Sequence, residues 1–373
     1  MNKIIDICTF YPKSKIKAGE GMTHGRFPFY TSSNTLNKYL NSYQIEEDGI
    51  ILGTGGNASI HYCSGRFSAS TDCLVICSKN PDIYNEYLYY YLLNSIHILE
   101  NGFRGAGLKH ISKKYIEDIE INYIPDVNIQ KKIINIINKS KILINKRKEQ
   151  IEALDELVKS QFIEMFGDPK DNNKRWEIKK LGDIYKVGSS KRIYQREQTS
   201  SGIPFLRISD LVKRIETGNN SCELYISEEQ YNSFKAKMLV PLENDILVTS
   251  RGTLGLCYIV KEKDKFYFQD GMISWLKQID VDVDPIYITT LFSMNGFRKQ
   301  IDEIPTGTTV NYLSIARLAN LEVMYPNIKL QNEFSNFVKQ VDKLKFEMEK
   351  SLKELEDNFN SLMQRAFKGE LFN

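Results

Sequence analysis

Polar side chains that can bind phosphates and base edges occur in short turns, at places that correspond between the two halves of the chain. Lys and Arg can neutralise phosphates, and Arg, Asn, Ser and Thr can also hydrogen-bond to base edges in the major groove. Taken singly, such residues are more often solvated surface. As two equivalent sets they favour a binding face for double-stranded DNA. The first set is Lys15, Lys17, Arg26, Tyr30, Thr54, Asn57, Arg104 and Lys109, and the second is Lys191, Arg192, Tyr194, Arg196, Arg207, Ser250, Arg251, Thr253, Thr308 and Asn311.

Motifs for catalysis or metal binding are weak or missing. The glycines of 53–56 follow an expected strand but lack the full spacing of a Rossmann or Walker loop, so a tight turn is the better interpretation. Cys73 and Cys77, with His61 and Cys63 nearby, have irregular spacing for zinc and read as core cysteines. We find no methyl-transfer, Walker-lysine, Gly-x-Ser-x-Gly or His-Glu-x-x-His motif. The sequence therefore predicts a chain with no catalytic residues, metal or cofactor of its own.

Composition sets broad limits on the class of protein. A length of 373 residues predicts two to three domains, and 42% hydrophobic residues suffice for real cores. The net charge of +3 permits nucleic-acid binding without arguing for it. No run of eighteen apolar residues and no signal-peptide core is seen, which predicts a cytoplasmic protein without membrane contact. The six cysteines are then expected to be reduced thiols.

Two long helices are expected to position the polar turns. The segment 129–166 lacks Pro and Gly and would form a rod of roughly 57 Å at ~1.5 Å per residue. The segment 330–367 has the same character. Each has an apolar residue every seven positions, so each has a seam that needs a partner. The seams are Ile137, Ile144, Ile151, Val158 and Met165, with Ile136, Leu143 and Leu157 beside them, and Phe334, Val341, Met348, Leu355 and Leu362.

An internal repeat of about 200 residues organises the chain. The entries to the two helices match, with Pro125 and Gln130 answered by Pro326 and Gln331. Upstream of each helix lies a unit of short strands and helices, predicting an α/β (α+β) duplicated fold. The following segments correspond: 2–7 with 179–184, 27–30 with 203–206, 50–57 with 246–253, Tyr62 with Tyr258, and 104–111 with 306–313. Apolar and turn-forming residues match while polar turn residues differ, so two copies that bind something should bind different versions of it.

The whole pattern resembles the specificity subunit of type I restriction-modification systems. The most specific pieces are 162–169, 180–184 with 203–211, the repeated Pro–Gln entries, and 366–371. The resemblance implies two globular target-recognition domains separated by two long helices that form an antiparallel coiled coil. The corresponding boundaries are 1–124 for the first domain, 125–168 for the central helix, 169–325 for the second domain and 326–373 for the C-terminal helix. The first domain is shorter than the second, which is a departure from the family's pattern.

The resemblance also implies a function. Each domain would read one half of an asymmetric, split DNA site, and a rod of roughly 57 Å compares with ~34 to 36 Å per turn of DNA. Such subunits are not catalytic alone. They recruit two methyltransferase subunits and then restriction subunits, and these partners would bind S-adenosylmethionine, ATP and Mg. The alternative is a coiled-coil scaffold whose α/β units bind proteins instead of DNA.

Overall fold

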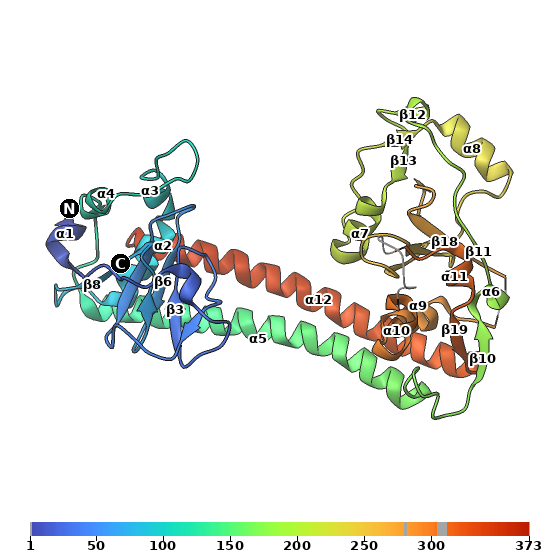
Figure 1. Ribbon diagram of the computed structural model, residues 1–373, viewed down its shortest axis with the longest axis horizontal. Helices are drawn as coiled ribbons and strands as arrows, with labels where there is room; N and C mark the ends of the chain where they lie inside the picture. The colour runs from blue at the N-terminus through green and yellow to red at the C-terminus, as the bar shows by residue number, and fades with distance from the viewer. Residues whose placement is uncertain (1, 280–281, 304–311, 373) are drawn as a thin grey trace. The chain divides into compact units, whose positions relative to one another are not determined.

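The computed structural model describes residues 2–279, 282–303 and 312–372 (Figure 1). The candidate residues Thr308 and Asn311 lie outside the described residues. The contacts within the structure divide the chain into unit 1, Met1–Glu149 with Lys350–Asn373, and unit 2, Gln150–Glu349. Each unit therefore contains one α/β domain together with one end of each long helix.

The two long helices are continuous, as the absence of Pro and Gly predicts. Helix α5 spans Val127–Phe166 and helix α12 spans Ile328–Phe367, each 40 residues, so both begin two positions earlier than the apolar repeat indicated. Gly167 and Gly369 follow them with φ of 83° and 79°. This left-handed conformation is the usual helix C-terminal cap and favours glycine because it has no Cβ.

Within unit 1 the helices pack side by side in opposite directions. Ile133 and Ile137 of α5 share a buried cluster with Met363 of α12. Further along α5, Lys148 pairs with Glu356 at 2.8 Å. Residue numbers rise along α5 as those of their α12 partners fall, which is the antiparallel pairing that the resemblance implied.

Unit 2 shows the same antiparallel pairing at the other helix ends. The rings of Phe162 and Phe334 lie 5.5 Å apart, and Asp155 accepts a hydrogen bond from Lys345 at 2.6 Å. The paired seam is narrower than predicted, because a single partner helix covers only part of the apolar stripe. Three residues assigned to it are exposed: Ile136, Leu143 and Leu157.

The domain of unit 1 is built around a four-stranded antiparallel sheet in the order β2-β8-β5-β6. Short helices cover one face of this sheet, and a smaller sheet, β4-β3-β7, completes the domain. The strands are β1 Asn2–Lys3, β2 Cys8–Phe10, β3 Phe27–Tyr30, β4 Tyr39–Leu40, β5 Gly49–Gly53, β6 Ile60–Cys63, β7 Ser68–Ala69, β8 Cys73–Ser78 and β9 Glu120–Ile121. The helices are α1 Ile4–Ile7, α2 Asn85–Asn94, α3 Ile96–Glu100 and α4 Lys113–Glu117, with a 3-10 turn η1 at Ala18–Glu20.

The domain of unit 2 repeats this plan, with a sheet in the order β11-β18-β15-β16 and a smaller sheet β12-β14-β13-β17. Its strands are β10 Glu177–Lys180, β11 Tyr185–Gly188, β12 Gln198–Thr199, β13 Ile203–Leu206, β14 Tyr225–Ile226, β15 Ile246–Thr249, β16 Cys257–Ile259, β17 Tyr267–Phe268, β18 Ile273–Gln278 and β19 Glu322–Tyr325. The helices that have counterparts in unit 1 are α6 Leu181–Ile184, α9 Pro285–Ser293, α10 Asn295–Asp302 and α11 Ile315–Ala319, with a 3-10 turn η2 at Gln195–Glu197. The greater length of the second domain comes from α7 Ile208–Thr217 and α8 Glu228–Ala236, which lie between β13 and β15.

The strand pairing corrects one predicted correspondence between the copies. In the first sheet Ile50 lies opposite Tyr62, whereas Ile246 at the same place in the second sheet lies opposite Ile259. Tyr258 precedes that position by one residue. Because side chains alternate between the faces of a strand, a one-residue offset moves a side chain to the other face. The predicted match of Tyr62 with Tyr258 is therefore wrong by one residue.

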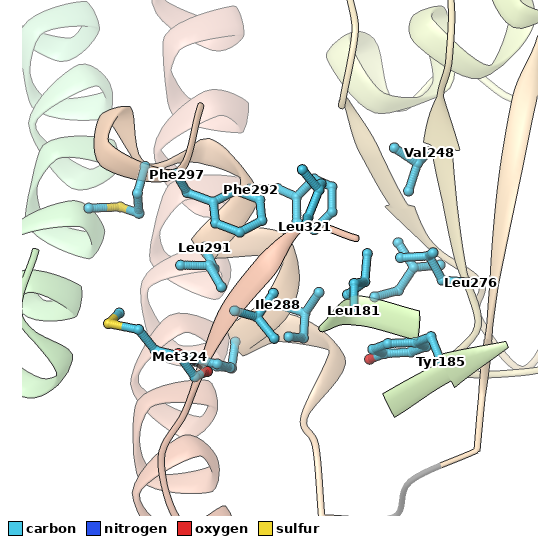
Figure 2. Packing of buried hydrophobic residues seen from close by; sticks show 14 of the residues in the cluster. Leu181, Tyr185, Val248, Leu276, Ile288, Leu291, Phe292, Phe297, Leu321 and Met324 are labelled. Carbon is cyan, nitrogen blue, oxygen red and sulfur yellow. Dashed lines mark hydrogen bonds between the residues drawn. The ribbon is translucent and has the colours of Figure 1, made fainter. Parts of the chain in front are cut away.

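The core of unit 2 fills the space between the sheet and the helices. In Figure 2, Val248 and Leu276 from the sheet gather with Leu181, Ile288 and Leu321 from surrounding elements. All of these side chains are at most 4% exposed. This packing fixes the sheet, and with it the loops at the ends of the strands.

A buried glutamine joins each domain to its own long helix. Gln130 of α5 accepts a hydrogen bond from the Tyr84 N–H at 2.8 Å and donates to the carbonyls of Asp82 at 2.7 Å and Ile124 at 2.6 Å. Its side chain is fully buried. Since one amide side chain satisfies three backbone groups, it fixes the segment 82–84, which leads into α2, against the start of α5.

Gln331 makes the same contact in unit 2. It accepts from the Asp284 N–H at 2.9 Å and donates to the carbonyls of Pro326 at 2.7 Å and Asp282 at 3.3 Å. It is also fully buried. The repeated Pro–Gln entries of the sequence are thus two copies of one structural joint.

Candidate nucleic-acid interface

In unit 2 the loop 250–253, which follows β15, is held to its surroundings on both sides. The Ser250 N–H donates to the Met272 carbonyl at 2.9 Å, and the Leu313 N–H donates to the Ser250 carbonyl at 3.0 Å. The Thr249 hydroxyl donates to the Thr253 carbonyl at 2.5 Å and accepts from the Leu256 N–H at 2.9 Å. These bonds make a rigid loop at the carboxyl end of a central strand.

Arg251 is the side chain that this loop presents. It is exposed, and its guanidinium lies 5.1 Å from the ring centroid of Tyr312, close enough for a cation–π contact. Two other candidate arginines have acidic partners: Arg192 pairs with Asp270 at 2.9 Å, and Arg207 pairs with Asp210 and Glu223. Among the ion pairs found in 2–279, 282–303 and 312–372, Arg251 takes no part.

Unit 1 has the same loop scaffold with different side chains. The Thr54 N–H donates to the Asp72 carbonyl at 2.8 Å, and the Ile111 N–H donates to the Thr54 carbonyl at 3.1 Å. The loop 54–57 packs on the segment 104–110, because Gly55 forms a β-bridge with His110. A Cβ on Gly55 would lie 3.4 Å from the His110 ring. Gly55 and His110 thus stand where unit 2 has Arg251 and Tyr312.

A further contact brings Arg104 and Lys109 of the first set to the same loop. The Gly56 N–H donates to the Lys109 carbonyl at 2.9 Å, and Arg104 exchanges backbone hydrogen bonds with His110. The side chains of Arg104, Lys109 and Asn57 are all exposed. The structure therefore gathers these three predicted residues at one strand end.

The loops after the first strand of each sheet add more basic residues. In unit 2 the Lys191 N–H donates to the Tyr267 hydroxyl at 2.8 Å, and Ser190 donates to the Phe268 carbonyl at 2.6 Å. This places Lys191 and Arg192 beside the segment that leads to Met272, the backbone partner of the Arg251 loop.

In unit 1 the Thr71 N–H donates to the carbonyl of Ile16, the residue between Lys15 and Lys17, at 2.9 Å. Thr71 precedes Asp72, whose carbonyl holds the Thr54 loop, so both lysines lie close to that loop. Both lysines are exposed. We call each gathering the strand-end surface: 15–17, 54–57, 71–72 and 104–110 in unit 1, and 190–192, 250–253, 269–272 and 312 in unit 2.

Four of the predicted residues make contacts within the protein. Tyr30 is 7% exposed and packs its ring on Phe67 and His61, and Ser250 is 1% exposed with its hydroxyl 2.7 Å from that of Ser274. Both sit at strand ends on the inward side, so neither side chain can reach a ligand in this conformation. The Thr54 hydroxyl donates to the Asp72 carbonyl, and Arg207 bonds Asp210 at the start of α7.

The remaining candidates lie on other exposed segments. Tyr194 precedes η2 and Arg196 lies within it, with the Arg196 guanidinium 5.4 Å from the Tyr194 ring. Arg26 precedes β3, and Thr253 ends the Arg251 loop. Tyr312 was not among the predicted site residues. Its place just before Leu313, matching His110 before Ile111 in the repeat, is the signal that could have found it.

Several of the cysteines lie in environments that disfavour the reactive thiolate. All six are free thiols in the structure. Burial raises the pKa of the Cys8 thiol to about 12 and also raises the pKa of Cys63 and Cys73. A thiol with a raised pKa stays protonated at neutral pH, and a protonated thiol is a poor nucleophile and metal ligand. Among the described residues no group of three His, Cys, Asp or Glu side chains could hold a metal, and no helix there has the length and apolarity to cross a membrane.

The fold and the two strand-end surfaces define a class: a duplicated α/β binding protein with a pair of long antiparallel helices. The family model for the type I restriction modification DNA specificity domain matches residues 1–153 and again 173–357. The chain therefore belongs to this family. It is a type I specificity subunit that recognises DNA sequence through two recognition domains.

Individual relatives and solved structures agree with this assignment. A putative type I restriction enzyme specificity subunit from Haemophilus influenzae is 25% identical over 86% of this chain and 81% of that protein. The EcoDI specificity subunit from Escherichia coli is 22% identical over 96% and 85%. The S subunit from M. genitalium shares the fold with a TM-score of 0.58 at 14% identity, covering 98% and 95%. A chain of a type I R-M system solved for its complex assembly gives 0.61 at 14%, covering 99% and 97%.

Thr249→Val tests the anchoring of the unit 2 loop. The change keeps the side-chain shape but removes the two hydrogen bonds of the hydroxyl, at a cost of about 1–2 kcal/mol in the free energy of unfolding. We expect binding to the half-site of the second domain to weaken, because Thr249 holds the loop of unit 2. The first half-site should be read as before, because unit 1 is unchanged and has Gly53, which has no hydroxyl, at the equivalent place. Competition binding with duplexes altered in one half-site measures this, and equal weakening at both half-sites would contradict it.

Proposed function

We propose that this chain reads an asymmetric, two-part DNA site and positions methyltransferase and restriction subunits on it. The observation that carries the proposal is the pair of strand-end surfaces, which share one backbone scaffold but differ in side chains. Gly55 and His110 of the first copy occupy the positions that Arg251 and Tyr312 occupy in the second copy. Two surfaces of the same geometry with different hydrogen-bonding groups suit two different half-sites on one duplex.

The chemistry of methylation and cleavage then belongs to the partner subunits. The thiols of raised pKa and the lack of a catalytic sequence motif support a chain that is not an enzyme alone. We propose that the methyltransferase subunits bind S-adenosylmethionine and that the restriction subunits bind ATP and Mg. Because unit 1 and unit 2 repeat the same plan of sheets and the same joint between domain and helix, we propose that each unit binds one methyltransferase subunit. Native mass spectrometry of the co-expressed complex should give one copy of this chain with two of its partner.

Salt dependence of DNA binding tests the proposal against a protein-binding scaffold. Each neutralised phosphate releases counterions, so a complex with about six phosphate contacts should lose about 1,000-fold in affinity between roughly 50 and 200 mM salt. Lys191→Ala should reduce the slope of log affinity against log salt by about 1. The matched control is Lys339→Ala, a change of an exposed lysine on α12, which should leave the slope unchanged. A complex with no measurable affinity for duplex DNA would contradict the proposal and favour the scaffold.

A further inference from the structure

The Arg251 side chain combines exposure with a fixed orientation. Gly252 follows it in the left-handed conformation, φ 66°, which favours glycine because it has no Cβ, so the loop turns sharply directly after Arg251. The hydrogen bonds of Ser250 and Thr249 hold the two flanks of the loop. The Tyr312 ring lies against the guanidinium at 5.1 Å. Backbone and side chain are therefore both arranged before any ligand arrives.

A fixed guanidinium plane suits one class of ligand better than another. Guanine offers two acceptors, O6 and N7, in the plane of the base at the major-groove edge, and arginine can donate to both at once. A phosphate contact depends mainly on charge, which an unrestrained lysine supplies equally well. Ordering the plane on an aromatic ring reduces the entropy lost on forming a two-pronged contact.

We propose that Arg251 reads a guanine of the half-site bound by the second recognition domain, and that Tyr312 acts as its positioning residue. This inference rests on the proposed function of the chain. At the corresponding place the first domain has Gly55 and His110, so its half-site is read without an arginine there. These two positions would then be one place where the two domains select different bases.

The test uses the co-expressed complex with its methyltransferase and a duplex carrying its two-part site. Each guanine of the second half-site is replaced in turn by 7-deazaguanine, which lacks the N7 acceptor but keeps Watson–Crick pairing. At one position we expect about 10- to 100-fold weaker binding by the unchanged protein. Arg251→Ala should bind weakly to both duplexes and no longer distinguish them. Arg251→Lys should also lose the distinction, yet keep the salt slope of the unchanged protein because it keeps the charge.

Tyr312 variants test the positioning role. Tyr312→Leu should reduce the discrimination between guanine and 7-deazaguanine, and Tyr312→Phe should restore it because the ring is retained. Thermal unfolding of each variant verifies that the domain remains folded, as expected for the exposed Arg251. A merely structural role for Tyr312 would lower the melting temperature without selective loss of discrimination.

Several results would overturn the inference while leaving the proposed function intact. These are a two-part site with no guanine in its second half, a site at which no 7-deazaguanine substitution matters, or an Arg251→Lys variant that discriminates as the unchanged protein does. Uniform weakening by Arg251→Ala on all duplexes, with a reduced salt slope, would make Arg251 a phosphate contact. The absence of any two-part site would instead contradict the proposed function itself.

Discussion

Phe162→Ala is expected to lower the free energy of unfolding of unit 2 by about 3–5 kcal/mol, the range for removing a fully buried phenylalanine. The ring is fully buried and lies 4.9 Å from the Phe166 ring and 5.5 Å from both Tyr287 and Phe334. Its neighbours come from α5, α9 and α12, so no single element can move to fill the space. The cavity should therefore persist, and its cost adds to the lost burial.

The matched control for this change is Phe346→Ala. Phe346 lies on α12 in the same unit but is 65% exposed, so the same truncation should cost less than about 0.5 kcal/mol. Urea or thermal unfolding of the purified complex measures both variants. Comparable destabilisation by the two variants, or none by Phe162→Ala, would contradict the account of how α5 and α12 pack.

Gln331→Leu is expected to destabilise unit 2 by about 3 kcal/mol or more. The change removes the hydrogen bonds to the Asp284 N–H and to the carbonyls of Pro326 and Asp282, and each buried hydrogen bond lost costs about 1–3 kcal/mol. The same change at Gln130 should act on unit 1 in the same way, because its three hydrogen bonds are equivalent. Thermal unfolding followed by circular dichroism measures the loss.

Two companion variants make the glutamine prediction specific. Gln331→Glu keeps the size and the acceptor but cannot donate to two carbonyls, so it should destabilise as well. Gln340→Leu, at an exposed position of the same helix, should change the free energy of unfolding by less than about 0.5 kcal/mol. If Gln331→Glu were as stable as the unchanged protein, the joint between domain and helix would not depend on these hydrogen bonds.

The long helices and the repeat could be predicted from the sequence because both signals are strong and continuous. Forty residues without Pro or Gly and an apolar residue at every seventh position leave few alternatives for α5 and α12. The width of the seam was harder to predict. Ile136, Leu143 and Leu157 fit an apolar stripe by type, but only the position of the partner helix decides which of them are covered.

The site was harder to predict than the fold, because exposure and charge pairing arise from tertiary contacts. Tyr30 and Ser250 have the right chemistry for DNA, yet the packing around the ends of β3 and β15 buries both side chains. Arg192 looks like Arg251 in the sequence but is paired with Asp270, which lies far away along the chain. Tyr312 becomes a candidate only when the structure places its ring against the Arg251 guanidinium.

Mapping modified adenines in DNA from cells that express this chain with its methyltransferase tests the central claim most directly. Two dissimilar strand-end surfaces predict one motif with two different specified parts separated by a fixed number of unread bases. The Arg251→Ala variant should relax only the part read by the second domain. A single continuous motif, a symmetric one, or relaxation of both parts together would contradict two independent readers in one chain.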